Sequence, residues 1–170
     1  MKKSCAILTE PPLCFPWGYD EEDESCAALK LLLLQRLSYL QTQDVTTFFV
    51  PLDDGIGLYA AELVSSLGRT NPGLSLTCCL PYEEQATKWH PDLRDRYFNA
   101  LAACADTVLS SREETPTGYL DAMLDAADHA ALVLAVSAET RSQDVSFAAA
   151  LRYAQRIGRT VERILPPKLY

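Results

Sequence analysis

The chain has 170 residues, of which 48% are hydrophobic and 22% are charged, a balance typical of a globular protein with a core of its own. Its formal net charge of -8 argues against non-specific binding to nucleic acid or to an anionic membrane, because both require a basic surface. The sequence contains no apolar run of 18 residues, so it predicts no transmembrane helix.

Strand-like and helix-like stretches alternate along the chain. In chain order, we expect a strand over 4–8, a helix over 23–41, a strand over 45–50, a helix over 56–67, a strand over 74–80, a helix over 91–104, a strand over 106–110, a helix over 118–128, a strand over 131–136, a helix over 145–157 and a strand over 160–165. Pro11 and Pro12 end the first strand, a break over 68–73 follows the second helix, and the loop after the third strand begins at Pro81.

This alternation predicts an α/β fold. Six strands separated by five helices favour a Rossmann-like three-layer sandwich, with a mainly parallel six-stranded sheet and helices on both faces. The fifth strand is apolar throughout, so we expect it to be central. The sequence shows no repeat and no linker, which indicates a single domain over residues 1–170.

The cysteines indicate a reduced protein. Six cysteines and two histidines occur, and no Cys-x-x-Cys pair is among them, which argues against a zinc site. Cys5, Cys78 and Cys79 lie in apolar stretches, where a cysteine acts as a small hydrophobic residue. The apolar run after residues 1–3 ends at Thr9, too early for a signal peptide. We therefore expect a cytoplasmic protein without a metal or other cofactor.

The predicted site lies at one edge of the sheet, because parallel sheets bind ligands beyond the carboxyl ends of their strands. The loops over 9–19, 51–57 and 81–89 supply its candidate residues, with no catalytic residue assigned. The candidate ligand-binding residues are Thr9, Glu10, Trp17, Tyr19, Asp53, Asp54, Gly55, Gly57, Tyr82, Glu83, Gln85 and Trp89.

Several of these residues have a simpler alternative role. The Glu10 carboxylate has the chemistry to contact a ribose hydroxyl or to act as a general base. The alternative is that Glu10 is only a loop residue before a proline pair. Trp17 and Tyr19 suit stacking on a ring, covering the sheet end or a dimer contact. Asp53 and Asp54 suit a metal or an acid–base pair. Capping of the following helix is favoured for them, since the nearby sequence offers no third carboxylate or histidine.

Three segments resemble a known family. The segments Pro16–Asp23, Leu80–Glu83 and Arg94–Tyr97, together with Trp89, resemble the YpsA-like proteins of the SLOG superfamily of Rossmann-like domains. The resemblance implies a Rossmann-like fold and a strand-end site for nucleotide-derived ligands. Relatives in the wider superfamily release a base from a nucleotide, bind DNA or sense nucleotides, and the resemblance implies no particular reaction for this chain.

The chain departs from the family pattern at the phosphate positions. The family has Thr-Gly-His-Arg-Pro after the first strand, where this chain has Leu-Thr-Glu-Pro-Pro over 8–12. Its Ser-Gly turn after the second strand is replaced by Val50 and Pro51, and its Gly-Val-Asp by Gly-Ile-Gly over 55–57. Pro51 removes one amide donor, Asp53 and Asp54 add negative charge, and the loss of the Arg and His removes two partners for phosphate. Each of these changes works against an anion, and charge-assisted hydrogen bonds are worth about 1.5–3 kcal/mol each.

Two functional hypotheses follow. The first is a non-catalytic domain with an eroded nucleotide-phosphate site, which binds a partner, its own copy, or an uncharged or cationic small molecule. The second is a nucleoside- or nucleotide-processing hydrolase that uses carboxylates at the strand ends, from among Glu10, Asp53, Asp54 and Glu83. A small-molecule ligand, nucleotide-derived or changed, and a homodimer are the partners left open, and the charge disfavours nucleic acid.

Overall fold

The computed structural model describes residues 3–169, in which strands and helices alternate as the sequence predicts. The elements are β1 (Lys3–Thr9), a short 3-10 helix (Pro12–Cys14), α1 (Glu24–Thr42), β2 (Val45–Pro51), α2 (Ile56–Thr70), β3 (Ser75–Tyr82), α3 (Pro91–Ala103), β4 (Asp106–Ser111), α4 (Gly118–His129), β5 (Leu132–Val136), α5 (Val145–Arg156) and β6 (Thr160–Ile164).

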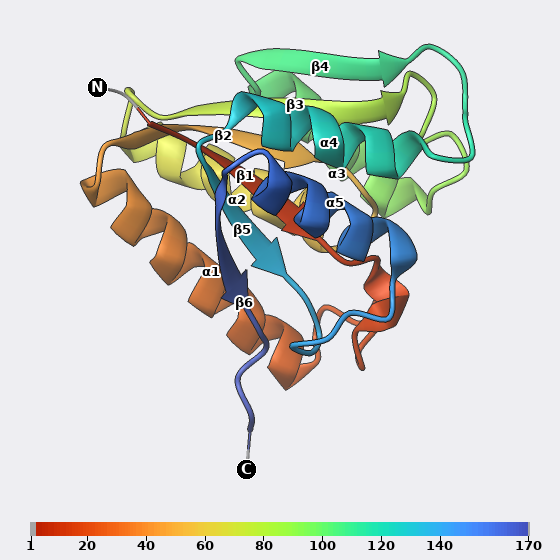
Figure 1. Ribbon diagram of the computed structural model, residues 1–170. Helices are drawn as coiled ribbons and strands as arrows, with labels where there is room; N and C mark the ends of the chain where they lie inside the picture. Colours follow the sequence, from red (N-terminus) through yellow and green to blue (C-terminus); the bar gives the residue numbers. More distant parts are fainter. Residues whose placement is uncertain (1–2, 170) are drawn as a thin grey trace.

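The strands form one six-stranded sheet in the order β4-β3-β2-β1-β5-β6, and every neighbouring pair is parallel (Figure 1). This confirms the predicted Rossmann-like α/β fold. The prediction that the fifth strand is central was wrong, because β1 and β2 hold the middle and β5 lies between β1 and the edge strand β6. Burial of both faces is enough to keep an interior strand apolar, so apolar sequence does not locate the centre.

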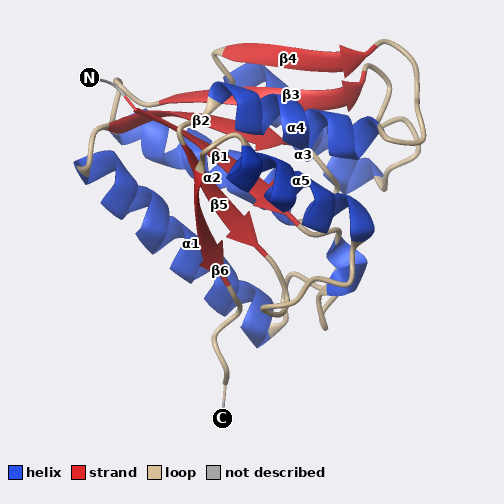
Figure 2. Ribbon diagram, in the orientation of Figure 1, coloured by secondary structure: helices blue, strands red, loops and turns tan. Residues whose placement is uncertain are grey.

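Helices cover both faces of the sheet, with α1, α2 and α3 on one side and α4 and α5 on the other (Figure 2). The side chains of β1 show how the two cores are divided. Cys5 and Ile7 belong to the core under the first three helices, whereas Ala6 and Leu8 belong to the core under the last two. Successive side chains of a strand point to opposite faces, so a fully apolar strand can supply both cores.

Two element ends differ from the sequence prediction by more than one residue. Helix α2 continues past Gly68 to Thr70, and the Asn71 side chain then donates a hydrogen bond to the Leu67 carbonyl oxygen at 2.9 Å. A glycine inside a helix costs only about 1 kcal/mol, so Gly68 does not stop it. Strand β3 continues through Tyr82, which pairs with Ser111 of β4.

The strand order also locates a crevice. From β1 the chain proceeds to β2, β3 and β4 on one side, and β5 and β6 lie on the other side. The carboxyl ends of β1 and β5 therefore flank the reversal point, where open α/β sheets commonly bind ligands.

Within residues 3–169, no helix is long and apolar enough to cross a membrane.

Candidate functional site

Five of the residues predicted from the sequence surround one cavity of about 350 Å³ at the carboxyl ends of β1, β2 and β3, here called the strand-end cavity. Its apolar walls are proline rings, aromatic rings and Leu52, and its polar lining consists of two carboxylates, an amide and a hydroxyl. The prolines and rings are Pro11, Pro12, Pro81, Pro116, Tyr82, Trp89 and Tyr119, and the polar side chains are Asp53, Asp54, Gln85 and Thr115.

Asp53 occupies the backbone amides at the start of α2. Its Oδ1 accepts hydrogen bonds from the Gly55 amide at 3.0 Å and from the Gly57 amide at 2.9 Å. This is the capping arrangement favoured from the sequence. The amides at a helix N-terminus are also the groups that hold a phosphate in nucleotide-binding α/β folds. In this chain a carboxylate of the protein itself takes their hydrogen bonds.

The glycines of this turn are packed against other parts of the chain. A Cβ atom at Gly57 would lie 2.5 Å from the carbonyl oxygen of Pro51 and 2.8 Å from Asp53 Oδ1. A Cβ atom at Gly55 would lie 2.5 Å from Cγ of Pro12. The Pro12 ring therefore packs directly against Gly55. Nothing in the local sequence around Gly55 indicates this contact.

Burial changes the protonation behaviour of Asp53. Loss of solvent raises the pKa of its carboxyl to about 7, and the neighbouring Asp54 carboxylate acts in the same direction, against the hydrogen bonds from the Gly55 and Gly57 amides. Asp53 Oδ2 is buried and has no hydrogen-bond partner within the described part of the chain. Asp53 thus combines a capping oxygen with a second, unpartnered oxygen.

Tyr119, in the first turn of α4, is a site residue that the sequence reasoning missed. Its hydroxyl lies 3.0 Å from Thr9 Oγ1 and donates to the Thr9 carbonyl oxygen at 3.1 Å. Burial and the Asp53 carboxylate raise the pKa of Tyr119 well above its usual value, so it stays a neutral phenol. The available signal was its place in the first turn of the helix after β4, because helical side chains point toward the N-terminal end.

Glu10 bridges the loops after β1 and β5 at the reversal point and lines a cavity of about 380 Å³ there. Its carboxylate is 2% exposed and accepts hydrogen bonds from the Ala138 amide at 2.7 Å and from Ser142 Oγ at 2.6 Å. The Glu10 amide donates to the Val136 carbonyl oxygen at 3.0 Å. A second carboxylate of the protein therefore fills a place where related folds bind ligands.

The aromatic loop before α1 is divided between the core and the surface. Trp17 is 7% exposed and stacks on Phe15 with ring centroids 5.0 Å apart, which fits the role of covering the sheet end. Tyr19 is half exposed, and its hydroxyl donates to Asp54 Oδ2 at 2.9 Å. Tyr19, Asp54 and Trp89 line a neighbouring cavity of about 520 Å³.

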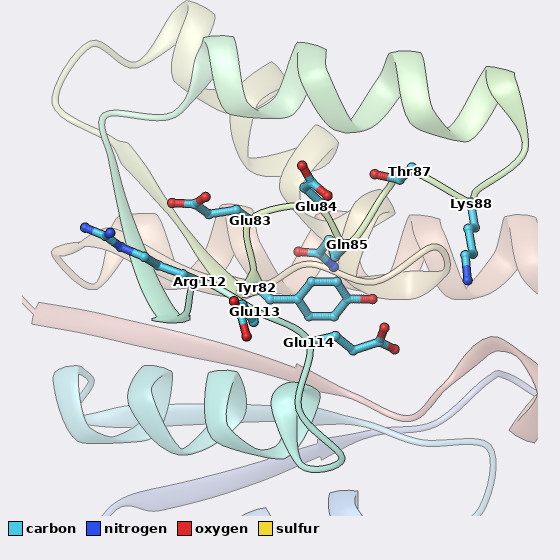
Figure 3. Close-up of a pocket in the computed structure, with 9 residues that line it drawn as sticks. All are labelled: Tyr82, Glu83, Glu84, Gln85, Thr87, Lys88, Arg112, Glu113 and Glu114. Carbon is cyan, nitrogen blue, oxygen red and sulfur yellow. The ribbon is translucent and has the colours of Figure 1, made fainter.

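Glu83 lies in a third cavity, of about 530 Å³, and does not line the strand-end cavity (Figure 3). Tyr82 and Gln85 line both, and Arg112 and Glu114 come from the loop after β4. Figure 3 shows the Glu114 carboxylate on the hydroxyl side of the Tyr82 ring. Burial, together with Glu114, raises the pKa of Tyr82. Of the four carboxylates named from the sequence, Asp53 and Asp54 line the strand-end cavity, whereas Glu10 and Glu83 do not.

Four charged residues form an ion network that does not line the strand-end cavity, and two of them, Glu21 and Arg96, lie in segments that resemble the YpsA-like proteins. Arg96 donates to Glu21 at 2.6 and 2.9 Å and to Glu62 at 3.0 and 2.7 Å, and Lys30 donates to Glu21 at 2.6 Å. Although burial acts to raise the pKa of Glu21, the hydrogen bonds from Arg96 and Lys30 outweigh it and lower the pKa to about 2. The network joins α1, α2 and α3, a pairing that the sequence reasoning missed.

Together these features define a Rossmann-like α/β domain whose strand-end backbone donors are held by its own carboxylates. Across residues 3–169, no three His, Cys, Asp or Glu side chains are grouped so that they could hold a metal ion. The YpsA family model, described as the YspA SLOG family, matches residues 14–169. The chain belongs to this family.

Two further similarities are weaker. UPF0398 protein BH1768 from Halalkalibacterium halodurans is 29% identical over 90 residues, which are 52% of this chain and 48% of that protein. The match thus spans about half the length of the curated relative. A solved universal stress protein in complex with cAMP aligns with a TM-score of 0.39 and 18% identity, over 72% of this chain and 98% of that one. A TM-score this low carries no argument about this chain.

Proposed function

We propose that this chain is a non-catalytic binding domain whose nucleotide-phosphate site has been replaced by its own carboxylates. The observation that carries the proposal is Asp53 Oδ1, which accepts hydrogen bonds from the Gly55 and Gly57 amides at 3.0 and 2.9 Å. Glu10 supports it independently, because it bridges the loops after β1 and β5. Both positions are where a bound anion would find donors in a fold of this type.

A phosphate would meet two obstacles at the start of α2. It would have to displace Asp53 from the amides, and it would come within about 5 Å of one or two carboxylates. At an effective dielectric constant of about 20, one such repulsion costs about 3 kcal/mol, which weakens binding more than a hundredfold. Ligands without a negative charge avoid this repulsion. A neutral or cationic small molecule, or a protein partner, is therefore the occupant we propose.

Isothermal titration calorimetry with AMP, NAD and ADP-ribose tests the proposal. We expect no saturable binding of any of them to the natural protein at physiological salt. The Asp53→Asn and Asp54→Asn variants make a matched pair, because each removes one charge and only Asp53 holds the α2 amides. Tight binding of any of these phosphates to the natural protein would overturn the proposal.

A second candidate, a hydrolase of nucleosides or nucleotides, is favoured by one observation. Asp53 lines the strand-end cavity beside Asp54 and has a pKa of about 7, the range that suits a general acid or base near neutral pH. Turnover assays on nucleosides and their monophosphates test this function. Release of a free base that is lost in Asp53→Asn but retained in Glu83→Gln would establish it. Absence of turnover would leave the binding domain as the better account.

A further inference from the structure

The strand-end cavity is lined by buried polar atoms that have no hydrogen-bond partner within residues 3–169. Three of its residues, Asp53, Gln85 and Thr115, each carry a buried oxygen that has no hydrogen-bond partner within residues 3–169. Gln85 is 8% exposed, and its amide nitrogen already donates to the Leu52 carbonyl oxygen at 2.8 Å, which leaves Oε1 as the free end. Buried polar atoms are nearly always paired in folded proteins, so three at one cavity call for a ligand.

The three oxygens belong to different connections of the fold. Asp53 comes from the β2–α2 turn, Gln85 from the β3–α3 loop and Thr115 from the β4–α4 loop. Each of the three residues lines the cavity. A ligand that donates several N–H groups would satisfy oxygens from all three connections at once.

The charges and the size of the cavity restrict the chemical class of the ligand further. Its charged side chains are the carboxylates Asp53 and Asp54, and the residues assigned to its lining in the described chain include no Lys, Arg or His. Trp89 and Tyr82 offer ring surfaces to a flat cation. A volume of about 350 Å³ is near the lower end for ligand sites and suits a single ring or a short planar group.

We propose that the strand-end cavity binds a small planar cation with two or more N–H donors, of the amidinium or guanidinium class. This inference rests on the proposed function, because it names the ligand chemistry of the same site. The cation would place its N–H groups against Asp53, Gln85 and Thr115 and its flat face against the aromatic wall. A phosphate or a carboxylate ligand offers no N–H donor to Gln85 Oε1 and is repelled by the Asp54 carboxylate.

Calorimetric titration with three probes tests the inference: benzamidinium, its isosteric anion benzoate, and inorganic pyrophosphate. We expect benzamidinium to bind saturably in the millimolar range or tighter, and benzoate and pyrophosphate not to bind. Thr115→Val removes one oxygen while keeping the shape of the side chain, and should weaken benzamidinium binding by about tenfold. Thr115→Ser should retain binding. Thr117→Val is the matched control, because the Thr117 hydroxyl faces Asp121 and does not line the cavity.

The outcomes separate this inference from the proposed function. Absence of benzamidinium binding, equal binding of benzoate, or an unchanged affinity in Thr115→Val would overturn the inference and leave the proposed function standing. Saturable pyrophosphate binding would overturn the proposed function, and with it the inference that rests on it.

Discussion

Replacing Gly57 by alanine tests the geometry of the turn at the start of α2. The added Cβ would lie 2.5 Å from the Pro51 carbonyl oxygen and 2.8 Å from Asp53 Oδ1, both closer than real Cβ contacts, so the first turn of α2 must move. Overpacking of this kind costs about 1–3 kcal/mol. Weakening the charged hydrogen bond to Asp53 adds about 1.5–3 kcal/mol, and the better helix propensity of alanine returns about 1 kcal/mol. The net loss is about 3 kcal/mol.

Urea and thermal unfolding measure this loss. A loss of about 3 kcal/mol lowers the melting temperature of a chain of this size by about 6–12 °C. Gly73→Ala is the control, because nothing lies within 4 Å of its added Cβ, and it should be neutral or stabilise by up to about 1 kcal/mol. Equal stability of Gly57→Ala and Gly73→Ala would refute the close packing of Asp53 and Pro51 against Gly57.

Three further predictions concern the charged groups. The folded protein holds the Asp53 proton up to about pH 7, whereas the unfolded chain releases it near 3.8, so this group makes stability fall as the pH rises between those values. The unfolding free energy of Asp53→Asn minus that of the natural protein should therefore rise by about 3 kcal/mol from pH 5 to pH 8, as measured by urea unfolding. The same difference at both pH values would contradict the raised pKa. Arg96→Gln should lose about 2 kcal/mol of unfolding free energy, because the carboxylates of Glu21 and Glu62 lose their cationic partner. Arg94→Gln on the same helix should lose little. Equal losses in the two unfolding curves would refute the network. Glu10→Ala removes the acceptor and should speed hydrogen exchange at the Ala138 amide, and an unchanged rate would show that this bond does not protect it.

Local patterns were enough to predict the fold. Each strand carries an apolar run, and each helix carries its own spacing and end signals, so the order of elements could be read from neighbouring residues. The capping of α2 by Asp53 was also predictable, because donor and acceptor lie only two and four residues apart. The ends of elements were less certain, as Gly68 in α2 and Tyr82 in β3 show.

Contacts between distant segments could not be predicted in this way. Arg96 and Glu21 lie 75 positions apart, and they meet only because the sheet order places α3 beside the start of α1 and α2. The Pro12 ring over Gly55 and the Glu10 bridge to Ala138 likewise depend on which strand ends are neighbours. The sequence therefore indicated the lost phosphate partners and the Asp53 cap, but the Glu10 bridge and the Pro12 contact emerged only from the three-dimensional arrangement.

The most direct test of the central claim follows the amide signals of Gly55 and Gly57 by NMR during a titration with ADP-ribose. If Asp53 holds these amides, both signals should stay unchanged up to millimolar ligand, while in Asp53→Ala, which leaves no side-chain acceptor at this position, the freed amides should shift. Saturable shifts of the Gly55 and Gly57 amides in the natural protein would show that a phosphate reaches the start of α2, and would contradict the account.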